Sequence, residues 1–237
     1  MKLAIMQPYF WPYIGYFQLM NVVDTFVVYD NIQYVKQSWI NRNRILVNGA
    51  DQFISLPLKK DSDYLNINQR FLSDSFSQEK IKLLNKIKGS YQKAPYFKEV
   101  YPLIEDTLNT GETNLFDFIY SSLVKLKEFL DIETKFIKSS KLNIDVEQYK
   151  AEEKVLAICN TLGAATYINP IGGIDLYSRE NFKKHNIDLL FVKSKDVVYP
   201  QFKNDFVPWL SIIDVLMFNG LEKTVAFVNS NYSYERN

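Results

Sequence analysis

Two of the few arginines in this chain lie close together. The sequence has five arginines, and two of them fall within the segment Asn41-Arg42-Asn43-Arg44. Arginine is favoured where planar, bidentate recognition of a phosphate or carboxylate matters. In an extended segment Arg42 and Arg44 would share a face. We therefore expect at least one of them to bind an anion, with Trp39 and Asn41 as neighbouring ligand contacts; the alternative is a surface or structural ion pair.

A second candidate site follows the first apolar run. Residues 3–6 are predicted to form a buried strand, Gln7-Pro8 interrupts it, and an apolar helical segment opens at Gly15. In open α/β sheets, ligands bind where the chain leaves the carboxyl end of a strand. Gln7, Pro8 and Gly15 are therefore candidate binding residues. Tyr13 and Tyr16 in the same segment are candidates for transferring a proton or orienting a substrate.

The next strand, residues 25–29, is followed directly by Asp30. An acidic residue in this position can accept a hydrogen bond from a ribose or sugar hydroxyl, and a turn or capping role is the alternative. Lys36, a few residues later, is a further candidate for proton transfer.

A glycine pair follows another expected strand at residues 166–168. Gly172 and Gly173 would let backbone amides approach a ligand closely, and Asp175 adds an acceptor and a further candidate for proton transfer. The alternative is an ordinary strand-to-helix loop in which the glycines supply positive φ angles.

Composition excludes several classes of function. The 28 basic and 27 acidic residues leave a net charge of +1, so there is no electrostatic case for nucleic acid or an anionic membrane as the main partner. One cysteine and one histidine do not suit the common zinc spacings or Cys-His and Ser-His catalysis, and no metal site is expected. Cys159 is expected on a buried helix face and His185 on the surface. Without a signal peptide or a membrane-spanning run, we expect a soluble cytoplasmic protein.

The order of apolar runs predicts one α/β domain over residues 1–237, with a Rossmann-like, mostly parallel sheet. The Asn48-Gly49 pair predicts a β-hairpin that would extend the sheet edge. Residues 64–72 are expected to add a strand, residues 208–220 to form a helix that ends at Gly220, and residues 229–237 to fray. A helical block at residues 73–132, whose first helix would end at Gly89, is expected to be an insertion or a substrate lid. The alternative is a set of crossover helices that cover one sheet face.

Four segments together resemble the WbqC-like protein family. They are Met-Gln-Pro-Tyr-Phe-Trp-Pro-Tyr-Ile-Gly-Tyr-Phe at 6–17, Val-Asp-Thr-Phe-Val-Val-Tyr-Asp at 23–30, Trp-Ile-Asn-Arg-Asn-Arg-Ile at 39–45 and Pro-Trp-Leu-Ser-Ile-Ile-Asp-Val-Leu-Met-Phe-Asn-Gly at 208–220. The resemblance implies a place in bacterial gene clusters for O-antigen and other surface polysaccharides, near enzymes that make nucleotide-linked amino sugars.

The segment 12–16 also resembles, more distantly, the HIGH-type nucleotidyl transferases, which include pantothenate synthetase. These enzymes carry His-x-Gly-His after the first strand; here Gly15 matches, and tyrosine occupies both histidine positions. A neutral tyrosine hydroxyl cannot supply the positive charge that stabilises a transferring phosphate. The segment Lys193-Ser194-Lys195 is similar to the Lys-x-Ser-Lys element of the same superfamily. The likeness implies the architecture and disfavours ordinary nucleotidyl transfer.

The resemblance leads to a first hypothesis: acyl or aminoacyl transfer to the amine of a nucleotide-linked amino sugar. ATP or an acyl-CoA would supply the activated donor. A non-catalytic nucleotide-sugar-binding or assembly protein is the second hypothesis, because no activated nucleophile is evident. A nucleotidyltransferase that releases pyrophosphate is the third.

Overall fold

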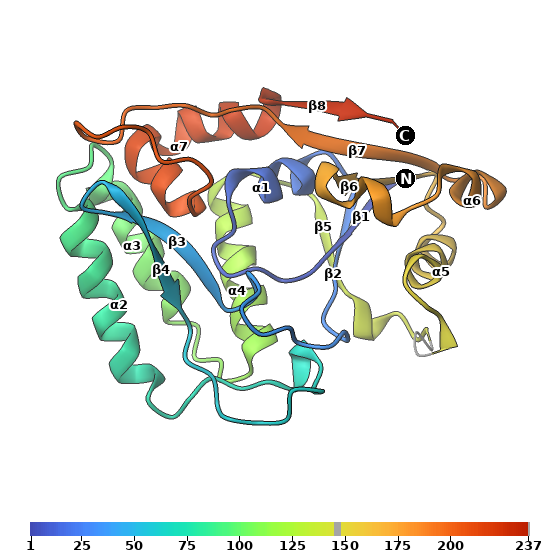
Figure 1. Ribbon diagram of the computed structural model, residues 1–237, viewed down its shortest axis with the longest axis horizontal. Helices are drawn as coiled ribbons and strands as arrows, with labels where there is room; N and C mark the ends of the chain where they lie inside the picture. The colour runs from blue at the N-terminus through green and yellow to red at the C-terminus, as the bar shows by residue number, and fades with distance from the viewer. Residues whose placement is uncertain (145–147, 237) are drawn as a thin grey trace.

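The expected α/β fold with a mostly parallel sheet is confirmed by the computed structural model, which describes residues 1–144 and 148–236. Six strands form one sheet in the order β5-β2-β1-β6-β7-β8, and all neighbours are parallel except β7 and β8 (Figure 1). The strands are β1 (Lys2–Met6), β2 (Thr25–Val28), β5 (Lys135–Lys138), β6 (Thr166–Pro170), β7 (Asp188–Ser194) and β8 (Tyr232–Glu235).

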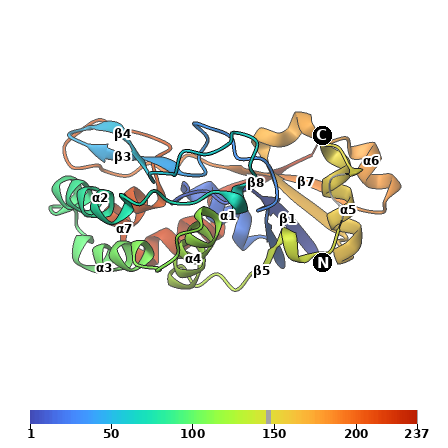
Figure 2. The same ribbon diagram turned by 90° about the horizontal axis from the view of Figure 1, so that it is seen from below.

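Helices lie on both faces of this sheet. They are α1 (Ile14–Asn21), α2 (Phe76–Tyr91), α3 (Phe97–Leu108), α4 (Leu115–Phe129), α5 (Glu152–Leu162), α6 (Arg179–Lys184) and α7 (Ile212–Ser230). Figure 2 shows α5 and α6 on one side of the strands, and α1, α4 and α7 on the other. Helices α2 and α3 pack beyond these helices (Figure 1). Because successive strand residues point to opposite faces, Leu3 and Ile5 enter the core beneath α5 and α6, whereas Ala4 enters the core of α1, α4 and α7. Within the described residues, none of the helices combines the length and apolar character needed to cross a bilayer.

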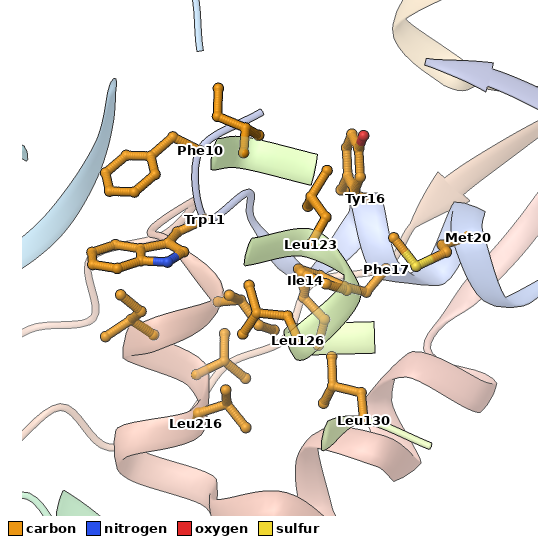
Figure 3. Packing of buried hydrophobic residues seen from close by; sticks show 14 of the residues in the cluster. Phe10, Trp11, Ile14, Tyr16, Phe17, Met20, Leu123, Leu126, Leu130 and Leu216 are labelled. Carbon is orange, nitrogen blue, oxygen red and sulfur yellow. The ribbon is translucent and has the colours of Figure 1, made fainter. Parts of the chain in front are cut away.

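The helical block shares the core of the sheet. Leu123 and Leu126 of α4 pack near Phe17 and Met20 of α1, with Leu216 of α7 in the same cluster (Figure 3). Buried residues of α2 and α3 belong to this cluster too. Within the block, α4 lies beside the sheet, whereas α3 packs on α4 and α7 and α2 packs on α3, away from the six strands (Figure 1).

The hairpin does not extend the sheet, so that expectation was wrong. β3 (Arg42–Val47) and β4 (Ala50–Ser55) form a separate two-stranded sheet, joined by the expected turn at Asn48 and Gly49, which have φ angles of 51° and 79°. The neighbouring positions beside β2 are taken by β1 and β5. The hairpin instead contacts α2, where the Leu46 amide donates to the Tyr91 hydroxyl at 2.8 Å.

Other expected boundaries also change. Residues 64–72 form isolated bridges around a 3₁₀ turn, Ile67–Gln69, because the Asn66 and Gln69 side chains make a capping box. The expected frayed end is wrong for Tyr232–Glu235, which pairs with β7 as β8; residue 237 lies outside the described residues.

Two helix ends also differ from expectation. α2 continues through Gly89 to Tyr91, and α7 starts at Ile212 rather than at residue 208. At Gly89 apolar packing outweighs the local preference of glycine for a helix end. At Gly220 the expectation holds, because its φ of 68° ends the first helical stretch of α7 and a second stretch follows across the kink.

Candidate functional site

The loop after β1 is held by two segments distant in sequence. The Asn43 side chain donates from Nδ2 to the carbonyl oxygens of Phe10 at 2.9 Å and Trp11 at 2.8 Å. The Ser211 hydroxyl donates to the Trp11 carbonyl at 2.7 Å. Three of the four segments behind the family resemblance therefore meet at this loop. Sequence reasoning missed Asn43 and Ser211, whose only signal was their position within those segments.

A cavity of about 610 Å³ opens at the carboxyl ends of β1 and β6. We call it the switch-point cavity, because the chain order in the sheet reverses between these two strands, and such a position is where ligands bind in open α/β sheets. Its lining includes Gln7, Tyr9, Tyr29, Glu152, Lys154, Asn169, Gly172, Gly173 and Tyr177. Of the candidate site residues from the sequence, Gln7 and both glycines are brought together here.

Two polar groups in the wall of this cavity lack partners within the described part of the chain. The Tyr29 hydroxyl is shielded from solvent and makes no hydrogen bond. Burial raises the pKa of Tyr29 to about 12, with a smaller contribution from nearby Tyr177, so the hydroxyl stays neutral and can donate to a ligand. Lys154, in the first turn of α5, takes part in none of the ion pairs among the described residues. Neither residue was a sequence candidate.

The placement of α5 explains why Lys154 faces this cavity. α5 is the crossover from β5 to β6, so it begins at the edge of the sheet where the parallel strands end. Its first turn lines the cavity, and a helix N-terminus carries partial positive charge. The Glu152 carboxylate in the same turn accepts hydrogen bonds from the Ser178 amide and from Asn181 Nδ2, the latter at 2.6 Å.

The two glycines differ in how strictly glycine is required. A Cβ at position 173 would lie 2.1 Å from Asn169 Nδ2, whereas a Cβ at position 172 would meet nothing within 4 Å. Neither residue has a positive φ, so the alternative that they serve a left-handed turn was wrong. Gly173 permits close packing against β6, and Gly172 exposes its backbone. Asp175 is exposed in the 3₁₀ turn Ile171–Leu176 and is not among the residues that line the cavity.

Tyr16 supports the switch-point cavity from behind. Its hydroxyl donates to the Gln7 carbonyl at 2.9 Å, and its ring is buried. Burial and the neighbouring Tyr9 raise the pKa of Tyr16 well above its ordinary value. A neutral, buried hydroxyl in this place positions the Gln7 backbone. Pro8 is buried in the same loop.

Tyr13 lies in a second, smaller cavity of about 280 Å³, together with Ser194, Lys195 and Trp209. Burial raises the pKa of Tyr13, and a hydrogen bond with Ser194 opposes the shift. A Cβ on Gly15 would lie 2.2 Å from the Tyr13 hydroxyl oxygen, so glycine lets this ring lie against α1. The HIGH-like turn and the Lys-Ser-Lys segment thus meet at this second cavity, at the carboxyl end of β7.

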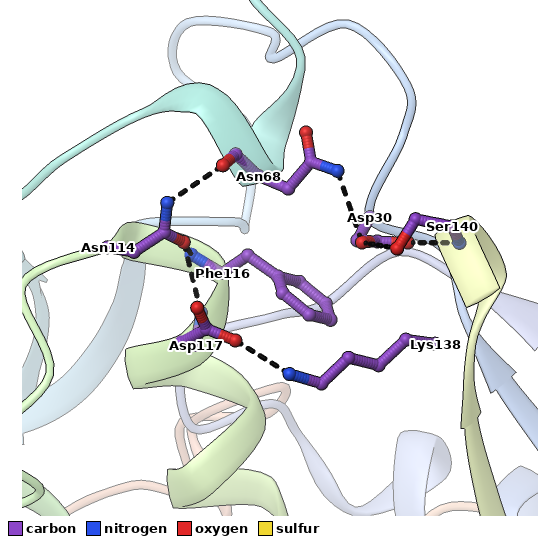
Figure 4. A network of polar contacts seen from close by, with 7 residues as sticks. All are labelled: Asp30, Asn68, Asn114, Phe116, Asp117, Lys138 and Ser140. Carbon is purple, nitrogen blue, oxygen red and sulfur yellow. Dashed lines mark hydrogen bonds and ion pairs between the residues drawn. The ribbon is translucent and has the colours of Figure 1, made fainter.

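Asp30 is satisfied by the chain itself. Its Oδ1 accepts from the Ser139 hydroxyl at 2.7 Å and the Ser140 amide at 2.8 Å, and its Oδ2 accepts from the Ser140 hydroxyl at 2.6 Å and Asn68 Nδ2 at 3.2 Å. Figure 4 shows the bonds to Ser140 and Asn68, from which the network continues through Asn114 to α4. Four internal donors favour the structural alternative over a sugar contact.

Arg42 and Arg44 lie on the hairpin, and neither is among the residues that line the switch-point cavity. The Arg42 guanidinium carbon lies 4.5 Å from the centre of the Phe53 ring, on which Trp39 stacks. Arg44 Nη1 pairs with Asp51 Oδ2 at 3.0 Å. For Arg44 this contact matches the ion-pair alternative.

The remaining candidates, Lys36 and Asn41, line a third hollow. Lys36 Nζ pairs with Asp63 at 2.8 Å. Asn41 Oδ1 accepts from the Tyr34 hydroxyl at 2.8 Å, and its Nδ2 donates to the Leu56 carbonyl at 3.0 Å. Six of the sequence candidates are therefore divided among three hollows, and the others line none of the three.

Cys159 is buried, as expected, and burial raises the pKa of its thiol to about 12. Because only the thiolate reacts readily, we expect Cys159 in the folded protein to resist a disulfide reagent such as dithionitrobenzoate at pH 8 and to react fully after denaturation. The absorbance of released thionitrobenzoate measures both. Rapid reaction of the native protein would contradict this placement.

The segments that meet at the β1 loop lie within a region that matches a known protein family. The sequence model of the WbqC-like protein family matches residues 7–226, which include the β1 loop, the hairpin and most of α7. The chain belongs to the WbqC-like protein family. Membership of this family suggests a role in O-antigen-related biosynthesis.

A WbqC-like relative is known from Mycobacterium tuberculosis (strain ATCC 25618 / H37Rv). This uncharacterized protein, Rv1507c, is 26% identical over 223 residues, which cover 93% of this chain and 95% of the relative. No solved structure gave a significant match.

Proposed function

We propose that this WbqC-like protein is an enzyme of surface-polysaccharide precursor biosynthesis that transfers an acyl or aminoacyl group to the amine of a nucleotide-linked amino sugar. The observation that carries the proposal is the switch-point cavity, where the Tyr29 hydroxyl has no hydrogen bond and the Lys154 ammonium no ion pair among the described residues. Unpaired polar groups in a cavity wall are costly unless a ligand satisfies them.

The cavity offers each part of such a ligand a suitable partner. Lys154 supplies positive charge for a diphosphate, and the backbone amides at the start of α5 supply donors, although Glu152 and Glu153 lie in the same turn. Tyr9 and Tyr177 supply aromatic surface for a base or sugar ring, and Tyr29 supplies a hydrogen bond. The Gly172 backbone leaves room for a close approach.

The proposed reaction forms an amide. The neutral sugar amine attacks the carbonyl carbon of the donor, a C–N bond forms, and the C–S bond of an acyl-CoA breaks to release the thiol. With an acid activated by ATP, the C–O bond of the acyl phosphate breaks instead and the phosphate leaves. The surplus ammonium proton passes to a base, and Glu152 is a carboxylate in the cavity wall that can accept it.

Binding tests the site directly. We expect Lys154→Ala to weaken binding of a UDP- or dTDP-linked amino sugar about tenfold, because a charge-assisted hydrogen bond is lost, and Tyr29→Phe to weaken it about threefold. Isothermal titration calorimetry measures both. Lys183→Ala removes the same charge from the exposed face of α6 and is the matched control. Equal affinity in Lys154→Ala and Lys183→Ala would reject this cavity as the binding site.

Turnover separates the enzyme from its alternatives. We expect a mass-shifted sugar when the protein is incubated with the amino sugar and either acyl-CoA, or ATP with glycine. Tight binding without any product would support the non-catalytic hypothesis, which the internal partners of Asp30 and Arg44 favour. Pyrophosphate release from a nucleoside triphosphate would support nucleotidyl transfer, which the meeting of Tyr13 and Ser194 favours.

A further inference from the structure

Arg70 is a buried cation that has no counterion among the described residues. The residue is only 5% exposed, and none of the ion pairs among the described residues includes it. Nη1 donates to the Ser62 carbonyl at 2.8 Å and Nη2 to the Lys59 carbonyl at 3.3 Å, whereas Nε is buried with no partner. A buried guanidinium that only carbonyl dipoles compensate is costly, and an anion would remove that cost.

Further positive charge surrounds the hollow beside Arg70. This hollow of about 250 Å³ is lined by Lys36, Lys59 and Lys60, with Asp61 as the acidic member of the lining. Lys36 and Lys59 each pair with an aspartate at 2.8 Å. Lys60 is exposed and takes part in no ion pair of the described chain. Two cations of the lining, Arg70 and Lys60, therefore have no ion pair among the described residues, against the one carboxylate of Asp61.

The rigid parts of this hollow are already in place. The Arg70 guanidinium carbon lies 5.0 Å from the centre of the Tyr34 ring, and the Tyr34 hydroxyl is fixed by Asn41. A guanidinium held on an aromatic ring and by two carbonyls loses little freedom when it binds an anion. Lys60, by contrast, is free to close over the ligand.

We propose that Arg70 and Lys60 form a phosphoryl-binding site. The ligand is a phosphate group, taken either as free phosphate or as part of a nucleotide, because guanidinium and ammonium donors suit its oxygens. No residue lines both this hollow and the switch-point cavity. The site therefore stands independently of the proposed sugar-binding cavity.

The test uses inorganic phosphate and the full chain. We expect phosphate, compared with chloride at equal ionic strength, to shift the NMR amide resonances of residues 58–63 and Arg70 saturably. Lys60→Ala is expected to weaken phosphate binding about threefold and Lys60→Glu about tenfold. Lys88→Ala, which removes an exposed charge from α2, is expected to bind like the wild type. Arg70→Lys should also bind weakly; where it fails to fold, the Lys60 variants decide.

Two results would overturn the site: no saturable shift, or wild-type affinity in Lys60→Glu. The same titration with UDP distinguishes the two sources of the phosphate group. If phosphate and UDP bind with equal affinity and Lys60→Glu weakens both, the site recognises the phosphate group alone and free phosphate is a sufficient ligand. Tighter binding of UDP with the same sensitivity identifies a nucleotide phosphate. UDP binding that responds to Lys154→Ala and not to Lys60→Glu, without binding of inorganic phosphate, also overturns it.

Discussion

Replacing Asp214 with alanine is expected to lower the free energy of unfolding by about 3–5 kcal/mol, because three buried donors lose their acceptor at once. Asp214 is 0% exposed. Its carboxylate accepts hydrogen bonds of 2.7 Å from the Tyr91 hydroxyl, the Tyr199 hydroxyl and Gln201 Nε2. It therefore joins α2, the loop before α7 and the first turn of α7. Urea denaturation at pH 7 measures the loss.

The effect of Asp214 also depends on pH. Burial raises the pKa of this carboxyl, an effect that the hydrogen bonds from Tyr199, Tyr91 and Gln201 oppose. Between the unfolded pKa of about 3.9 and the raised folded pKa, the folded protein holds one more proton than the unfolded chain. Its contribution to stability is thus fully present below the unfolded pKa and falls as pH rises through the folded pKa.

Asp214→Asn isolates this titration. We expect the stability difference between wild type and Asp214→Asn to favour the wild type most at low pH and to shrink as pH rises, then to stay constant. Asp205→Ala, an exposed aspartate of the same loop, is the matched control and should change stability by less than about 0.5 kcal/mol. A stability difference that is independent of pH, or an Asp214→Ala variant as stable as Asp205→Ala, would contradict the buried network.

The second large effect is expected at Asn43. Asn43→Ala should lower the free energy of unfolding by about 2–4 kcal/mol, because the Phe10 and Trp11 carbonyls lose a buried donor and the Arg44 amide loses its acceptor. The residue is 4% exposed, so water does not replace these bonds. Urea denaturation again measures the change.

A matched variant separates this loss from the general effect of shortening an asparagine. Asn85→Ala changes an exposed position of α2 and should alter stability by less than about 0.5 kcal/mol. Because Asn43 holds the loop that carries Gln7, its loss should also weaken ligand binding in the switch-point cavity. Equal stabilities of the two variants would show that the loop does not depend on Asn43.

Much of the fold was predictable because its signals are local. Apolar runs located β1, β2, β5, β6 and β7, helical spacing located α3, α4 and α5, and the Asn48-Gly49 pair located the hairpin turn. Gly163 was expected to close α5 and does so with φ of 66°. These features depend on backbone preference and on the period of apolar residues, both of which short segments carry.

Strand partners were less predictable because pairing joins distant segments. The residues of Tyr232–Glu235 do not indicate that this segment pairs with the edge of β7. The residues of the hairpin likewise do not indicate that β1 and β5 occupy both sides of β2. The local sequence pattern of a C-terminal segment or a hairpin is therefore the same whether or not the sheet has an unpaired edge strand for it to join.

The candidate site divides in the same way. The sequence by itself determined that Gln7, Gly172 and Gly173 follow strands, so their place at the carboxyl edge of the sheet could be predicted. Only the tertiary structure added Tyr29 and Lys154, because the sheet order and the start of α5 bring them to that edge. It also gave Asp30 and Arg44 internal partners, Ser140 and Asp51. The residue type determines which groups a polar side chain can bind. The fold determines whether other residues of the chain already occupy its hydrogen-bonding or ion-pairing groups.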